Sequence, residues 1–136
     1  MEIKLNKILL IDDSEATNFF NTMIVKKTNC VDEVLIARDG KEALDIIVSG
    51  NIPDILFLDV NMPVMNGWDF LENLKKYDIG SKKPIIVLMI GAEITIDEKR
   101  KAVEVFGVHE FSEKMLTVNK VLNIVDKHFN EEIVFV

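Results

Sequence analysis

The chain has 136 residues, the size of one ordinary domain, so two independent cores are not expected. Hydrophobic residues make up 49% and charged residues 29%, which is typical of a globular protein and not of a disordered one. Sixteen basic residues against 23 acidic ones give a net charge of -7, and this disfavours direct nucleic-acid binding through phosphate neutralisation. The single cysteine, Cys30, excludes an internal disulfide. No apolar run is long enough for a membrane span, and the first residues do not resemble a signal peptide, so we expect a cytoplasmic protein with no membrane partner.

Short apolar runs alternate with amphipathic stretches from one end of the chain to the other. The continuous apolar runs predict strands buried on both faces, and the stretches with apolar residues at helical spacing predict helices. In chain order the expected elements are a strand at 7–11, a helix at 14–28, a strand at 33–37, a helix at 41–48, a strand at 55–58, a helix at 68–77, a strand at 85–90, a helix from 95 to about 106, a weak strand at 108–111 and a helix at 117–129.

Local signals mark several of these boundaries. Asp39-Gly40 and Asn66-Gly67 are turn sequences, and Pro84 stands where the start of a strand tolerates proline. Thr95 with Glu98 three residues later predicts a capping box for the fourth helix. In the first helix the residues at apolar helical spacing are Ala16, Phe19, Phe20, Met23 and Ile24.

Five strands alternating with five helices predict an α/β protein with a doubly wound parallel sheet and helices on both faces. Right-handed crossovers leave few topologies, and the flavodoxin-like strand order 2-1-3-4-5 is the expected one. In that order the first and third strands are neighbours at the point where the winding reverses. Asp12, Asp13 and Asp59 follow or end these two strands, so three carboxylates should converge on one crevice.

Three converging carboxylates repel one another unless a cation compensates their charge. Mg²⁺ (or Mn²⁺) prefers such oxygen ligands, and a carboxylate beside it can act as a nucleophile that forms an aspartyl phosphate. Any one of these acids could instead be a solvated helix cap, but that explanation is weak for three at one switch point.

At these residues the chain resembles a known family. The stretches at residues 8–14 and 56–67 are similar to the two signatures of two-component response regulator receiver domains, in particular the single-domain, chemotaxis-type regulators. The stretch at residues 39–44 resembles the family's turn into its second helix, and the likeness extends from about residue 7 to residue 128.

The resemblance implies a role for each matching residue. Asp59 matches the acceptor of a phosphoryl group from a histidine kinase or phosphotransfer protein. Asp12 and Asp13 match the acidic pair that holds Mg²⁺, with Asp13 the direct ligand, and Asn61 matches the position whose backbone carbonyl completes the metal site. Lys114 matches the lysine that pairs with the phosphoryl oxygens.

Three positions depart from the family pattern. The family ends its fourth strand with Thr or Ser, and here the matching position is either Met89 or Gly91, neither of which has a hydroxyl. Met115 stands where the family usually has proline after the lysine, which should loosen the placement of Lys114. Phe111 matches the aromatic switch position but cannot donate the hydrogen bond of a tyrosine.

The leading hypothesis is a receiver domain at residues 1–129 with a short tail at 130–136 and no output domain. It would act as a phosphorylated switch that docks on a protein partner, with no enzymatic activity beyond its own phosphorylation and dephosphorylation. A degenerate receiver that binds partners without phosphorylation is the alternative. A phosphatase-type enzyme is disfavoured, because such enzymes need a second acid two residues after the nucleophile and Asn61 stands there.

We expect the downstream partner to dock on the face formed by the fourth helix, the fifth strand and the fifth helix, around Lys99, Lys101, Phe111 and Asn119. His109 and His128 are isolated in the sequence and are interpreted as ordinary surface or helix-end residues.

Overall fold

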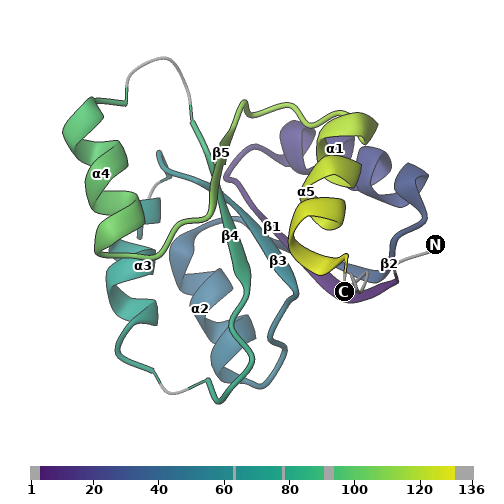
Figure 1. Cartoon of the computed structure of the whole chain (residues 1–136). Coiled ribbons are helices and arrows are strands. Elements are labelled where there is room, and N and C mark those ends of the chain that lie inside the picture. Colours follow the sequence, from purple (N-terminus) through teal and green to yellow (C-terminus); the bar gives the residue numbers. More distant parts are fainter. Residues whose placement is uncertain (1–3, 63, 78, 91–93, 131–136) are drawn as a thin grey trace, which may run out of the picture.

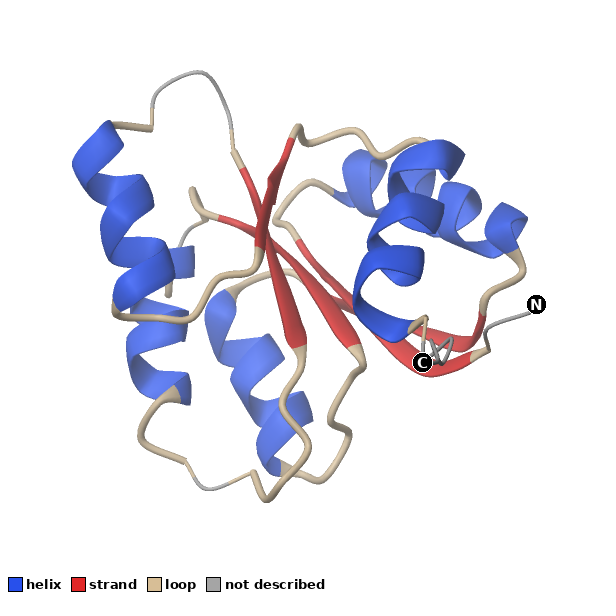
Figure 2. Ribbon diagram, in the orientation of Figure 1, coloured by secondary structure: helices blue, strands red, loops and turns tan. Residues whose placement is uncertain are grey.

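The computed structural model describes residues 4–62, 64–77, 79–90 and 94–130. It contains one five-stranded parallel sheet with the order β2-β1-β3-β4-β5, which confirms the predicted fold class (Figures 1 and 2). The elements in chain order are β1 Leu5–Ile11, α1 Glu15–Thr28, β2 Val31–Ala37, α2 Gly40–Val48, β3 Ile55–Asp59, α3 Gly67–Leu74, β4 Ile85–Met89, α4 Ile96–Glu104, β5 Glu110–Ser112 and α5 Val118–Phe129. No helix in the described ranges is both long and apolar enough to cross a membrane.

The helices form two layers around the sheet. Helices α1 and α5 cover one face, and α2, α3 and α4 cover the other (Figure 1). Alternate strand residues belong to the two cores, as the period of a strand requires. Leu9, Leu56 and Leu88 pack on the side of α2–α4, whereas Leu10 and Phe57 pack on the side of α1 and α5. Both faces are therefore apolar, which explains why the strands appear in the sequence as continuous apolar runs.

The helix starts agree with the local sequence signals. Thr95 and Glu98 form the expected capping box of α4, with both hydrogen bonds at 3.0 Å. Ser14, Asn66 and Thr117 cap α1, α3 and α5, each by accepting a hydrogen bond from a backbone N–H three residues later.

Several boundaries differ from the prediction, and strand β1 begins two residues early, at Leu5. Strand β2 begins two residues early, at Val31, because Val31 still pairs with Leu5 of β1. Helix α3 ends at Leu74 instead of continuing to residue 77, since the N–H of Tyr77 bonds three residues back, in a tightened last turn. The ladder of β5 spans Glu110–Ser112 and not 108–111.

Helix α1 forms where predicted, but of the five residues at apolar helical spacing only Ile24 packs against the core. Phe19 is 67% exposed, and Phe20 and Met23 are exposed as well. The buried positions are Asn18, Asn21 and Val25. Both ends of the Asn21 amide and the Nδ2 of Asn18 hydrogen-bond to backbone groups outside the helix, whereas Asn18 Oδ1 is buried without a partner among the described residues.

His109 is exposed and His128 lies in the last turn of α5, as expected of surface or helix-end residues, but the two meet in the structure although they are distant in the sequence. Their rings lie 5.7 Å apart in an edge-to-face arrangement, because β5 and the end of α5 bring them together. His128 Nε2 lies 3.1 Å from a carboxylate oxygen of Glu110, and Nδ1 of His109 accepts a hydrogen bond from the N–H of Ile86. The two histidines therefore connect β4, β5 and α5 at the edge of the sheet where the strands begin.

Candidate functional site

Three carboxylates meet at the carboxyl end of the sheet, as the topology predicted. Asp59 is the last residue of β3, and Asp12 and Asp13 directly follow β1, its neighbour in the sheet. One carboxylate oxygen from each residue lies within 4.8 Å of the other two. Asp59 is 1% exposed and Asp12 is buried, whereas Asp13 is open to solvent.

Backbone groups of the adjoining loops orient the two buried carboxylates. Asp12 Oδ1 accepts a 2.9 Å hydrogen bond from the N–H of Ser14, the residue that caps α1. Asp59 Oδ1 accepts a 3.2 Å bond from the N–H of Asn61. These bonds place the acids at the start of α1 and of the β3–α3 loop, where the side chains face one another.

Lys114 reaches the same crevice from the loop between β5 and α5. Its ammonium lies 3.3 Å from Asp59 Oδ1, although its side chain is 41% exposed. The other carboxylate oxygen, Asp59 Oδ2, is buried and has no hydrogen-bond partner among the described residues. One oxygen of Asp59 is thus paired with Lys114, and the other has no counterpart among the residues described.

The environment makes ionisation of both buried acids unfavourable. Burial raises the pKa of Asp59, and the charge of Lys114 and the bond from Asn61 oppose this only in part. Burial also raises the pKa of Asp12, and the neighbouring charge of Asp59 adds to the effect. The charge of Asp13 acts in the same direction on both groups. A hard cation with oxygen ligands fits this set of donors, because it supplies the missing positive charge and a partner for Oδ2.

Gly67 shapes the loop that carries Asn61. A Cβ atom at Gly67 would lie 2.7 Å from the carbonyl oxygen of Asp59 and 2.8 Å from the Cα of Val60, too close for any other residue. The N–H of Gly67 donates to the carbonyl of Val60, which closes the loop directly after the acid. The turn sequence predicted this glycine's location, but not its contact with the backbone of Asp59.

The positions that depart from the family pattern have different environments. Met89 is buried in the core beneath α1 and α5 and lies opposite Asp59 in the strand register. Gly91, the other candidate for the missing hydroxyl, lies outside the described residues. Phe111 is half-buried, with the ammonium of Lys99 5.7 Å from its ring centroid. Met115 is 51% exposed, and no peptide bond in the described residues is cis.

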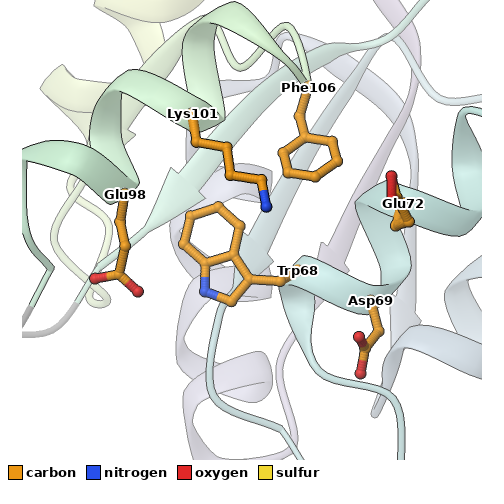
Figure 3. A pocket seen from close by; sticks show the side chains of 6 residues that line it. All are labelled: Trp68, Asp69, Glu72, Glu98, Lys101 and Phe106. Atoms are coloured by element: carbon orange, nitrogen blue, oxygen red, sulfur yellow. The ribbon is translucent and has the colours of Figure 1, made fainter.

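A separate groove lies between α3 and α4, and its lining does not include Asp12, Asp13 or Asp59. It is lined by Trp68, Asp69, Glu72, Glu98, Lys101 and Phe106 (Figure 3). The ammonium of Lys101 lies 5.7 Å from the ring centroid of Phe106, whose ring is 6.3 Å from that of Trp68. Lys101, expected on the partner surface, therefore already has an aromatic contact within the chain.

Sequence reasoning missed two residues near the crevice, Asn18 and Asn21. Asn18 Nδ2 donates a 2.7 Å bond to the carbonyl oxygen of Asp12, and Asn21 bonds to the loop that contains Lys114. Their spacing of three residues on one side of α1 was the available signal. A search for apolar periodicity does not detect it, because both residues are polar.

Comparisons with known proteins agree with this geometry. The sequence profile of the response regulator receiver domain matches residues 8–126. "Two-component response regulator 24" of Arabidopsis thaliana is 30% identical over 119 residues, which cover 88% of this chain and 81% of that protein. The solved structure of a two component response regulator from Cytophaga hutchinsonii has a TM-score of 0.80 and 32% identity, and the match covers 94% of this chain and 99% of that one.

A third relative is much longer. A protein-glutamate methylesterase/protein-glutamine glutaminase of Methylobacillus flagellatus is 36% identical over 123 residues, but the match spans only 33% of its length. This chain is therefore similar to only one part of that protein. The profile match over most of the chain, the topology and the cluster of acids lead to one conclusion: the chain belongs to the response regulator receiver domain family.

Proposed function

We propose that the protein is a phosphoacceptor switch of a two-component phosphorelay and that Asp59 is the residue phosphorylated. What supports this most is the state of the Asp59 carboxylate: Oδ1 is paired with Lys114, and Oδ2 is buried next to two further acids with no hydrogen-bond partner in the part of the chain that the structure describes. The arrangement presents a nucleophile together with the positive charge that a transferred phosphoryl group needs.

The groups suited to form the metal site are the side chains of Asp12, Asp13 and Asp59 and the backbone carbonyl of Asn61. Of the pair Asp12 and Asp13, we expect Asp13 to contact the ion directly. When bound, Mg²⁺ neutralises charge on the carboxylates and on the phosphoryl oxygens. Because the pKa of Asp59 is raised, Lys114 is needed to favour the ionised, nucleophilic form of its carboxyl.

In the proposed transfer an oxygen of Asp59 attacks the phosphorus of the donor. The new P–O bond forms as the P–N bond of a phosphohistidine, or the P–O bond of acetyl phosphate, breaks, and the leaving group takes the electron pair. Lys114 then pairs with the phosphoryl oxygens. Dephosphorylation is the attack of water on the same phosphorus, which releases the carboxylate of Asp59.

Nothing in this sequence of steps requires a second catalytic acid. Asn61, two residues after the nucleophile, has a side-chain amide, which does not exchange a proton with a leaving group at neutral pH. We therefore assign to the chain only its own phosphorylation and dephosphorylation.

The partners follow from this role. A histidine kinase or histidine phosphotransfer protein supplies the phosphoryl group, in the cytoplasm, and residues 1–129 form the receiver unit. We place the downstream contact on the face of α4, β5 and α5, around Lys99, Lys101, Phe111 and Asn119.

The test is incubation with acetyl phosphate and Mg²⁺, followed by intact mass and peptide mapping. The wild type should gain one phosphoryl group on Asp59, and Asp59→Asn should gain none. Asp45→Asn is the matched control, because Asp45 is an exposed residue on α2 whose carboxylate pairs with Lys41. Labelling that survives in Asp59→Asn, or that maps to a serine or histidine, contradicts the proposal.

One observation favours a second function. The chain lacks the hydroxyl and the proline of the family pattern, at Met89 or Gly91 and at Met115, as a degenerate receiver would. A wild type that stays unlabelled in the same experiment supports this binding module and not the phosphoacceptor.

A further inference from the structure

The loop that carries Lys114 is hydrogen-bonded to α1 through the side chain of Asn21. Asn21 is 4% exposed, and its Nδ2 donates a 3.0 Å hydrogen bond to the carbonyl oxygen of Lys114. Its Oδ1 accepts a 3.0 Å bond from the N–H of Leu116. The two bonds enclose Met115 and use both ends of the Asn21 amide.

The side chain of Leu116 anchors this loop in the core beneath α1 and α5, but the loop's backbone lies outside the regular elements. Strand β5 ends at Ser112 and α5 begins after its cap, Thr117, so the polar groups of residues 114 and 116 belong to neither the sheet ladder nor the helix. Leu116 is 1% exposed, and a buried N–H there requires a partner. Met115 points to solvent and contributes no anchor in the core.

Helix α1 connects the two sides of the crevice. One turn before Asn21, Asn18 donates to the carbonyl oxygen of Asp12 at 2.7 Å. Through Asn18 and Asn21, one face of α1 thus hydrogen-bonds to the backbone of Asp12 and to the backbone of Lys114. Because a helix is rigid over one turn, the separation of Asp12 and Lys114 is set by Asn18 and Asn21.

We propose that Asn21 is a positioning residue for phosphoryl transfer: it holds the backbone of Lys114 so that the ammonium meets Asp59, at the place where the family pattern has a proline and this chain has Met115. The proposal rests on the proposed function of Asp59. The side chain of Lys114 is long and 41% exposed, so the direction of its ammonium depends on how firmly its backbone is held. We therefore expect the two hydrogen bonds of Asn21 to hold the loop of Lys114 in place of the missing proline.

The experiment is a double-mutant cycle of Asn21→Leu and Lys114→Ala, read out as the rate of labelling by acetyl phosphate with Mg²⁺. Asn21→Leu should slow labelling about tenfold or more, because small misplacements of a charge-stabilising group have large effects on rate. In the Lys114→Ala background the same substitution should change the rate less than about twofold, since Asn21 acts through the lysine.

Val25→Ala is the matched control for stability. Val25 is fully buried on α1, one turn after Asn21, and lies in the core and not at the loop. It should lower the melting temperature, yet leave the labelling rate of the folded protein within about twofold of the wild type. The inference is overturned if Asn21→Leu labels at the wild-type rate, or if it slows labelling equally with and without Lys114.

A second readout separates this inference from the proposed function. At constant pH, the ¹³Cε and ¹⁵Nζ resonances of Lys114 should shift in Asn21→Leu toward those of a solvated lysine and stay unchanged in Val25→Ala. A wild type that takes up no phosphoryl group refutes phosphorylation of Asp59, while the lysine resonances still decide whether Asn21 positions Lys114. Unchanged resonances in Asn21→Leu refute the positioning role even if labelling occurs.

Discussion

Asp13 is the only exposed member of the three acids, and its charge acts on two buried neighbours. Burial is the main cause of the raised pKa of Asp12 and Asp59, and the charge of Asp13 adds to it, so Asp13 further disfavours ionisation of both buried groups. A carboxyl whose pKa is raised by folding stabilises the folded state below its unfolded pKa of 3.8. That stabilisation is lost as the pH rises through the folded-state pKa.

Asp13→Asn should therefore raise the free energy of unfolding of the metal-free protein at pH 7, by on the order of 1 kcal/mol. The advantage over the wild type should shrink as the pH falls toward 3.8, because the buried acids are then protonated in both proteins. The measurement is urea unfolding with a chelator at several pH values. A metal-free variant less stable than the wild type at pH 7 contradicts this electrostatic account.

With Mg²⁺ the order should reverse. A ligand that binds only the folded state adds RT ln(1 + [L]/Kd), on the order of 1 kcal/mol when Mg²⁺ is a few-fold above Kd. Millimolar Mg²⁺ should raise the melting temperature of the wild type, and Asp13→Asn should lose most of that gain because a direct ligand is missing. An unchanged wild-type melting temperature would show that the metal site is assigned wrongly.

At the scale of the elements, signals that lie close together in the sequence predicted the structure well. The capping box of Thr95 and Glu98 and the apolar runs of the strands depend on neighbouring residues, and both were confirmed. The convergence of Asp12 and Asp59 was also predicted, because sheet topology alone brings the two strand ends together.

Contacts between distant polar residues were not predicted. Asn21 and Lys114 are 93 positions apart, and no periodicity connects a buried asparagine to a particular loop. His109 and His128 meet only because β5 and α5 return to the same edge of the sheet. Such pairs depend on tertiary packing, which a pattern of apolar residues does not encode.

The histidine pair makes stability depend on pH at this edge. Burial lowers the pKa of His109, and the neighbouring His128 lowers it further, while Glu110 opposes both. Lys127 also contacts Glu110, and the main chain of Ile86 donates to Nδ1 of His109, so a proton on Nδ1 would break that bond. A base with a lowered pKa stabilises the folded state above its unfolded pKa of 6.5, and this is lost as the pH falls through its folded-state pKa.

The wild type should thus lose stability relative to His109→Asn as the pH falls from about 7 to 5, at no more than about 1.4 kcal/mol per pH unit. Asparagine keeps an acceptor near the Nδ1 position but does not titrate. The readout is the difference between the two proteins in urea unfolding, so that the titration of Asp12 and Asp59 cancels. The lowered pKa of Glu110 affects stability only below its unfolded value of 4.5. Parallel pH profiles in the two proteins would show that His109 does not titrate in this way.

In the whole molecule, the proposed phosphorylation of Asp59 at the carboxyl end of the sheet would have to change the proposed docking face of α4, β5 and α5. The balance between inactive and active conformations is shifted only by contacts that differ between them. The family pattern places a hydroxyl at the end of the fourth strand, and a hydrogen bond from it to a charged phosphoryl group is worth about 1.5–3 kcal/mol. The chain has Met89 or Gly91 there, so this contact is absent.

Phosphorylation should consequently shift the population less than it does in a receiver with the hydroxyl, by a factor of about ten or more in the switching constant. Gly91→Thr and Met89→Thr, made in separate proteins, test this. One of them should enlarge the phosphorylation-dependent NMR shifts on the face of α4, β5 and α5, around Lys99, Phe111 and Asn119.

The two substitutions differ in their side effects. Met89 is 4% exposed in the core, so threonine there removes buried volume and should lower the melting temperature, which must be measured before the shifts are compared. An NMR shift counts as restored switching only if it appears or grows when the variant is phosphorylated. A shift that is equally present in the unphosphorylated variant does not count. If the wild type already shows full-sized shifts on that face and neither threonine changes them, the hydroxyl does not limit the switch. The contact that drives it would then have to come from Lys114 and the loop that Asn21 holds.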